Sequence, residues 1–194
     1  MNPRGAAWRR HAGWLVCTLA AGCAGLPAAT DGVNYSGRFA LAVTGVDRHE
    51  TVSGRFALNV ARPEVTLDLS TPLGTTVARV QSGPSGARLT VPSASGLRTA
   101  QGPDPDALSL QVLGWTLPVS GLGDWIEGRP AAGRPYRLEP GADGSEQLEQ
   151  DGWTIRLEPR GADGRIRRLD MSRPQQGDAP AVQLRVMLDP QAAP

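Results

Sequence analysis

The hexapeptide Ser-Gly-Arg-Phe-Ala-Leu occurs twice in this chain, at residues 36–41 and again at 53–58. Each copy lies in a run of alternating apolar and polar residues, from Tyr35 to Val43 and from Val52 to Val60. Alternation with a period of two is typical of a strand with one buried face. Two copies 17 residues apart are too few for a solenoid. The repeat therefore predicts neighbouring arms of an antiparallel meander with similar faces.

Further alternating runs follow the repeat, and clusters of Gly, Pro, Asp and Ser separate most of them. They lie at residues 65–70, 75–81, 87–91, 134–139, 147–150, 153–157, 166–171 and 182–188. With the two repeat strands this makes about ten short strands at regular spacing, which is the pattern of a sandwich or a barrel.

The middle of the chain has helical rather than strand periodicity. Asp104 can cap a helix that begins at Pro105 and ends at Gly114, and Ser120 can cap a second short helix that ends at Gly128. Two such helices either cover one opening of a barrel or pack on the edge of a sandwich. Periodicity alone does not separate these arrangements.

The N-terminus has the features of a processing segment. Residues 1–22 combine a positively charged start with an apolar stretch at 12–21, which is too short to span a bilayer. Small residues directly before Cys23 resemble the bacterial lipobox, in which that cysteine is acylated. We expect a signal peptide at 1–22, a lipidated linker at 23–34 and one domain at 35–194; an ordinary secretory signal is the alternative. Ala24, in place of the aspartate that retains lipoproteins in the inner membrane, favours the outer membrane.

Composition excludes several function classes. The chain has 194 residues with a formal net charge of +1, and all 20 of its cationic Lys and Arg residues are Arg. Lysine-dependent chemistry is therefore excluded, and no basic field predicts nucleic-acid binding. The sequence has no His/Cys cluster for zinc and no dinucleotide or phosphate-loop signature, so no cofactor or metal is expected.

The candidate catalytic residues are few. His49 is the one histidine after the signal segment, and we expect it in a turn between the first two strands. The carboxylate pairs Asp104/Asp106 and Glu149/Asp151 lie in polar turns, where solvated surface is the better interpretation. We therefore do not expect an enzyme, although an envelope enzyme with unrecognised carboxylate chemistry stays open as an alternative.

Several segments resemble the LolB family of outer-membrane lipoprotein receptors, and they occur in family order over about residues 35–172. They are the two Ser-Gly-Arg-Phe segments, Ser-Thr-Pro-Leu-Gly at 70–74, Leu-Gly-Trp-Thr-Leu-Pro at 113–118, Trp-Ile-Glu-Gly-Arg-Pro at 125–130 and Gln-Asp-Gly-Trp-Thr-Ile at 150–155. The chain departs from the family in a short stretch before the first strand, in Leu58 where an aromatic is common, and in Leu188-Asp189-Pro190 near the C-terminus.

The resemblance implies a mainly β fold: an incomplete antiparallel β-barrel with short covering helices around an apolar cavity. A lipid-anchored protein of this family faces the periplasm from the outer membrane. It takes acylated lipoproteins from a LolA-like periplasmic carrier and inserts them into outer-membrane lipid as a monomer, without an external energy source. The resemblance also assigns membrane insertion to a protruding loop, which corresponds here to Leu73 between Pro72 and Gly74.

The strongest apolar positions of the predicted strands and helices are candidates for the cavity lining, and each could equally be ordinary core. These candidates are Phe39, Leu41, Phe56, Leu58, Leu67, Leu69, Trp115 and Trp125. A lipid-anchored barrel that binds another hydrophobic ligand without transferring it remains the alternative function.

Overall fold

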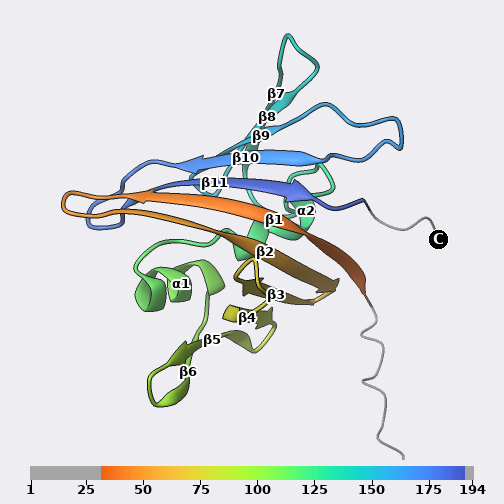
Figure 1. Cartoon of the computed structure of the whole chain (residues 1–194). Coiled ribbons are helices and arrows are strands. Elements are labelled where there is room, and N and C mark those ends of the chain that lie inside the picture. Colours follow the sequence, from red (N-terminus) through yellow and green to blue (C-terminus); the bar gives the residue numbers. More distant parts are fainter. Residues whose placement is uncertain (1–31, 191–194) are drawn as a thin grey trace, which may run out of the picture.

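The computed structural model describes residues 32–190 as one curved antiparallel sheet with two short helices (Figure 1). Cys23 and the predicted signal peptide lie outside the described residues. The strands of the first half are β1 (Val33–Thr44), β2 (His49–Ala61), β3 (Glu64–Ser70), β4 (Thr76–Gly83), β5 (Gly86–Ser93) and β6 (Gly96–Gly102). Those of the second half are β7 (Tyr136–Pro140), β8 (Glu146–Gln150), β9 (Trp153–Leu157), β10 (Arg168–Arg173) and β11 (Ala181–Leu188).

The strand order is β6-β5-β4-β3-β2-β1-β11-β10-β9-β8-β7, so two meanders meet where β1 pairs with β11. The sheet is open, because β6 and β7 form its two edges. Inward-facing side chains of the strands and apolar side chains of both helices share a single core. This arrangement confirms the predicted mainly β fold, an incomplete antiparallel barrel with short covering helices. Among the described residues, no helix is long and apolar enough to cross a membrane.

The repeated hexapeptides pair with each other, as predicted. The register of β1 and β2 sets Gly37 opposite Phe56 and Phe39 opposite Gly54. A Cβ on Gly37 would lie 2.8 Å from the Phe56 ring, and a Cβ on Gly54 would lie 3.0 Å from the Phe39 ring. Each glycine therefore leaves the space that the phenylalanine of the other copy occupies, which explains why the two residue types recur together.

The first predicted helix is confirmed in type and extent. Helix α1 (Pro105–Leu113) begins after Asp104, whose carboxylate accepts hydrogen bonds from the backbone N–H groups of Asp106 and Ala107. It ends at Gly114, whose φ of 81° is in the left-handed region that favours glycine.

The predicted limits of the second helix are wrong. Helix α2 (Val119–Trp125) begins before Ser120 and ends before Gly128, and the capping position belongs to Pro118. Ser120 does not cap its own helix because both its N–H and its hydroxyl donate to Asp106.

Strand β6 is absent from the ten predicted strands. Its residues are exposed except Ala100 and Gly102, which are half-buried, so the sequence carries no alternation of buried apolar side chains. It forms because β5 offers a complete row of pairing partners, from Ala87 opposite Gly102 to Ser93 opposite Gly96.

Candidate functional site

A small cavity lies between the inner face of the sheet and the segment 115–122. Every side chain that lines it is apolar, and its volume is about 20 Å³. The lining consists of Phe39, Leu41, Phe56, Leu67, Leu69, Trp115, Leu117, Pro118, Leu122, Leu184 and Val186. The floor comes from strands β1, β2, β3 and β11, and the cover comes from the end of the α1–α2 connection and from α2.

The structure places six of the eight predicted lining residues around this cavity: Phe39, Leu41, Phe56, Leu67, Leu69 and Trp115. Leu58 and Trp125 are buried elsewhere in the same core. Leu58 lies opposite Leu67 in the β2–β3 register, and the Trp125 indole donates a 2.8 Å hydrogen bond to Gln150.

Sequence analysis missed five lining residues: Leu117, Pro118, Leu122, Leu184 and Val186. Three of them carried a usable signal. Leu184 and Val186 lie on the apolar face of the predicted strand at 182–188, and Leu122 lies in the predicted second helix. Leu117 and Pro118 lie in a connection without periodicity, so nothing in the sequence placed them over the cavity.

The described conformation is closed. A volume of about 20 Å³ is close to what one water molecule needs, whereas small-molecule pockets measure about 300–1,000 Å³. An extended apolar ligand therefore requires the cover to move. Displacing the four cover residues would leave the seven apolar side chains of the strands facing an open space.

A polar clasp holds the cover shut where α1 meets α2. The Asp106 carboxylate accepts the Ser120 N–H and the Ser120 hydroxyl, each at 3.0 Å. Burial raises the pKa of Asp106 to about 6, although the two Ser120 hydrogen bonds act in the opposite direction. The expectation that Asp106 lies on solvated surface is wrong, because this carboxylate is buried where it binds the start of α2.

Two neighbours extend the clasp. The buried Ser109 hydroxyl donates to the Asp106 carbonyl and accepts the Leu117 N–H, which ties α1 to the cover. Arg134 donates to the Ser120 carbonyl at 2.9 Å and forms an ion pair with Asp151 at 2.6 Å. Asp151 is only half-buried, but it too is engaged rather than solvated.

The far end of α2 is fixed separately. Asp124 forms ion pairs with Arg62 at 2.7 Å and with Arg129 at 3.0 Å. Gln150, which is buried, accepts from the Trp125 indole and exchanges two hydrogen bonds with the Ala131 backbone. The C-terminal end of α2 is thus bound by groups other than Asp106, although Gln150 also donates to the carbonyl of Arg134, which extends the clasp.

The predicted insertion loop is the β3–β4 turn. Leu73 at its tip is 96% exposed, and Pro72 and Gly74 are exposed beside it. The Thr71 hydroxyl accepts the Thr75 N–H, and Gly74 donates to the Thr71 carbonyl with a φ of 88°. These bonds hold the turn in a shape in which the Leu73 side chain has no packing partner in the fold.

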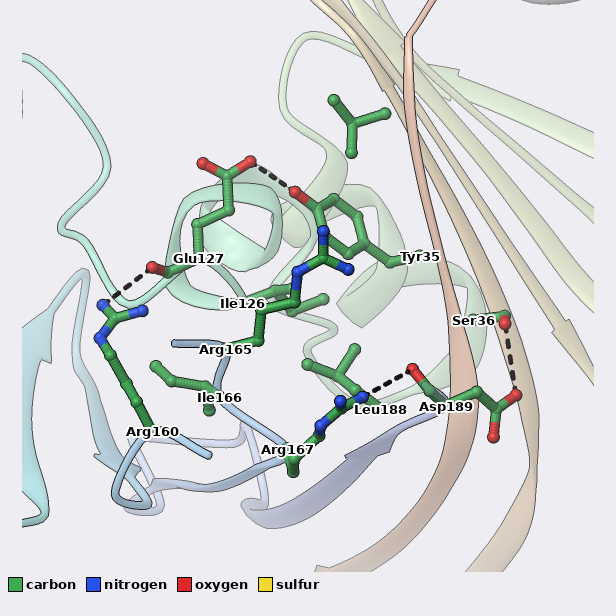
Figure 2. Close-up of a pocket in the computed structure, with 11 residues that line it drawn as sticks. Tyr35, Ser36, Ile126, Glu127, Arg160, Arg165, Ile166, Arg167, Leu188 and Asp189 are labelled. Atoms are coloured by element: carbon green, nitrogen blue, oxygen red, sulfur yellow. Dashed lines mark hydrogen bonds between the residues drawn. The ribbon is translucent and has the colours of Figure 1, made fainter. Parts of the chain in front are cut away.

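A second cavity of about 250 Å³ lies at the start of β1 (Figure 2). The Tyr35 hydroxyl donates to Glu127 at 2.5 Å, and burial and this bond raise the pKa of Tyr35. Arg160 donates to the Glu127 carbonyl, and Arg167 donates to the Asp189 carbonyl (Figure 2). These two guanidinium groups bind backbone carbonyls of the fold, and no pattern in the sequence singles out this cavity.

Two of the candidate catalytic residues, Asp106 and Asp151, are joined through Ser120 and Arg134. His49 is the first residue of β2, is exposed, and lies 3.4 Å from the Thr44 hydroxyl. Within residues 32–190, no group of three or more His, Cys, Asp or Glu side chains could hold a metal ion.

Comparison with known proteins identifies relatives over most of the chain. The family model described as "Outer membrane lipoprotein LolB" matches residues 32–189. The protein named outer-membrane lipoprotein LolB of Ralstonia nicotianae is 36% identical, over 90% of this chain and 92% of that relative. The protein of the same name from Bordetella petrii is 41% identical, over 78% of this chain and 79% of the relative.

Among solved structures, the crystal structure of the LolA superfamily protein NE2245 from Nitrosomonas europaea aligns with a TM-score of 0.35. The two chains are 12% identical, over 84% of this chain and 89% of that one. The fold assignment given above rests on strand order and register.

Proposed function

The chain belongs to the LolB family of outer-membrane lipoproteins, and we propose that it accepts acylated lipoproteins from a LolA-like periplasmic carrier and inserts them into the outer membrane. The observation that carries this proposal is the all-apolar interior under a separately fastened cover. The family supports the outer membrane as its location. The lipid anchor at Cys23, the preceding signal peptide at 1–22, the linker at 23–34 and the periplasmic orientation are parts of the same proposal.

The need for such an interior follows from the chemistry of the cargo. Each buried methylene is worth about 0.8 kcal/mol, so exposing the acyl chains of a lipoprotein to water costs on the order of tens of kcal/mol. A protein that passes this cargo across an aqueous compartment must keep the chains in an apolar environment throughout. Side chains such as Phe39, Leu67 and Leu184 supply that environment on the sheet side of the cavity.

The cover sets how the interior opens. Because the C-terminal end of α2 is bound through Asp124 and Trp125, and α1 packs on β4, β5 and β6, we place the hinge at the end of α2. The opening motion then lies in the connection at 114–118 and the start of α2. The Asp106–Ser120 bonds must then break or shift when the cavity is loaded. The proposed acyl-chain contacts are the six predicted residues that line the cavity, together with the five that sequence analysis missed. Leu58 and Trp125 belong to the same core outside the lining.

In this proposal, the transfer of cargo from the carrier to this chain requires no nucleotide. Both carrier and acceptor hold the chains away from water, so only the difference in their affinities decides the direction of transfer. A preference of about 1.4 kcal/mol already gives a tenfold bias. Release into the bilayer follows when the exposed Leu73 enters the lipid and brings the opened interior to the membrane surface.

A transfer assay tests the proposal. The full-length lipidated chain is reconstituted in vesicles of phosphatidylethanolamine and phosphatidylglycerol, and a LolA-like carrier loaded with acylated lipoprotein is added without nucleotide. We expect the cargo to leave the carrier and to float with the vesicles. The cargo should then be inserted in the bilayer and no longer bound to this chain. Cargo that stays on the carrier overturns the proposal, and cargo that remains bound to this chain shows a binding protein that does not deliver.

A further inference from the structure

Two neighbouring hairpins end at the same end of the sheet. In a meander, alternate turns fall at one end, so the β3–β4 and β5–β6 turns lie together, whereas the β4–β5 turn lies at the other end. Leu73 forms the tip of the first hairpin, and Leu97 follows the turn of the second. Leu97 is 77% exposed.

Leu97 does not stand alone on the outer face. The β5–β6 register sets it opposite Pro92, which is also exposed. On the neighbouring strand β4, Val77 is 38% exposed and points outward, because the alternate positions Ala78 and Val80 point into the core and are buried. We call Leu73, Val77, Pro92 and Leu97 the hairpin patch.

The charge pattern around the hairpin patch indicates its partner. The stretches 71–77 and 92–97 contain no charged residue. The charged residues that follow them, Arg79 and Arg98, are both cationic, and Arg79 neutralises Asp68. With Arg79 paired to Asp68, the charge that remains beside the two apolar tips is the cation Arg98. Apolar tips beside a cation fit a lipid surface, in which acyl chains lie behind anionic headgroups.

A third turn at this end of the sheet has the opposite character. Val46 in the β1–β2 turn is 87% exposed, but Asp47 and Arg48 follow it directly. Arg48 also pairs with Glu50. Val46 is therefore a matched control: an exposed apolar turn residue surrounded by charge.

We infer that the hairpin patch is a two-hairpin membrane-contact surface, in which Leu97 enters the lipid beside Leu73. The inference rests on the proposed function, since it extends the membrane-inserting element from one turn to two. Two buried leucines hold the protein at the bilayer surface more firmly than one, and the adjoining strands give both hairpins a fixed spacing. Leu97 is thus a second insertion residue that family resemblance does not assign.

Two measurements test it with the full-length lipidated chain in vesicles of phosphatidylethanolamine and phosphatidylglycerol. Amide hydrogen exchange should slow at 92–97 and 71–77 when the chain moves from detergent to vesicles, and should stay unchanged at 44–48. In the transfer assay, Leu97→Glu should accept cargo at the wild-type rate and deliver it about tenfold more slowly. Val46→Glu should deliver at the wild-type rate.

The outcomes separate this inference from the proposed function. If Leu97→Glu delivers normally while Leu73→Glu does not, the second insertion residue is rejected and the proposed function stands. If the wild-type chain takes no cargo but 92–97 is still protected on vesicles, the membrane surface stands and the proposed function fails. If sedimentation shows a dimer that Leu97→Glu dissociates, without any protection by vesicles, the patch joins two copies of the chain and the inference is overturned.

Discussion

The Asp106 carboxylate receives both polar hydrogens of Ser120, the backbone N–H at one oxygen and the hydroxyl at the other, each at 3.0 Å. These bonds join the first turn of α1 to the start of α2, beside the apolar cavity rather than within it. The cover is therefore fastened by polar groups that can exchange their partners for water, while the surface beneath it is entirely apolar. Such an arrangement allows opening without breaking the core of the sheet.

Removing the Ser120 hydroxyl should loosen the cover. Ser120→Ala takes away one of two donors to a buried carboxylate and one of the acceptors of Arg134, so we expect a loss of about 1.5–3 kcal/mol in the free energy of unfolding. Urea unfolding measures this loss, and binding of a fluorescent hydrophobic dye should rise. The exposed Ser95 serves as the control position, and equal effects of Ser95→Ala and Ser120→Ala would argue against a clasp.

The stability of the fold should depend on the protonation of Asp106. Its pKa is raised from 3.8 to about 6, so the folded state binds the proton more readily than the unfolded state. The contribution of Asp106 to stability is therefore largest below about pH 4 and is lost as the pH rises through 6. It amounts to about 2–3 kcal/mol.

Comparing the wild type with Asp106→Asn isolates this contribution from that of other titrating groups. From pH 5 to pH 7, the free energy of unfolding should fall more in the wild type than in the variant, apart from changes that both proteins share. The same pH dependence in both proteins would show that the buried carboxylate does not titrate in this range.

The Gly–Phe exchange between the repeated hexapeptides should be intolerant of added volume. A Cβ at Gly54 would lie 2.1 Å from the Ser70 carbonyl oxygen and close to the Phe39 ring, so Gly54→Ala should destabilise the fold by about 2–3 kcal/mol. At Gly45 the nearest atom to an added Cβ is 3.5 Å away, and Gly45→Ala should change stability little. Thermal unfolding measures both effects, and the melting temperature of Gly54→Ala should lie well below that of Gly45→Ala. Similar melting temperatures of the two variants would contradict the packing of Gly54 against Phe39.

Leu73 should be required for delivery and not for folding. Because its side chain is 96% exposed, Leu73→Glu should leave the melting temperature unchanged and should accept cargo normally. Transfer into vesicles should fall about tenfold or more, since a carboxylate cannot enter the lipid as leucine does. Insertion at the wild-type rate by this variant would remove the proposed role of the turn.

The sequence predicted the meander well because its signals were strong and local. The paired repeats, the alternating runs and the Asp104–Gly114 helix all formed as expected. Strand β6 escaped prediction because edge pairing with β5, not burial of its own side chains, determines it. The start of α2 was misplaced because Ser120 looks like a cap in sequence, while in the structure Asp106 takes its hydrogen-bonding groups.

The site was predictable in type but not in detail. The lining and the ordinary core use the same apolar residues, so the sequence could not distinguish Leu67 from Leu58. The two lie opposite each other in the β2–β3 register, yet Leu67 lines the cavity and Leu58 does not. Whether the cavity is open or closed depends on contacts between segments far apart in sequence, such as those of Arg134 with Ser120. No periodicity reports such contacts.

The central claim is that acyl chains enter the cavity lined by Trp115. Quenching of tryptophan fluorescence by brominated acyl chains tests it directly, because bromine quenches only at short range and Trp115 lines the cavity whereas Trp125 and Trp153 do not. When a carrier transfers a lipoprotein with brominated chains to the full-length protein, we expect fluorescence to fall in the wild type and to change little in Trp115→Phe. Equal quenching in the two proteins, or none in either after the cargo is bound, would contradict the account.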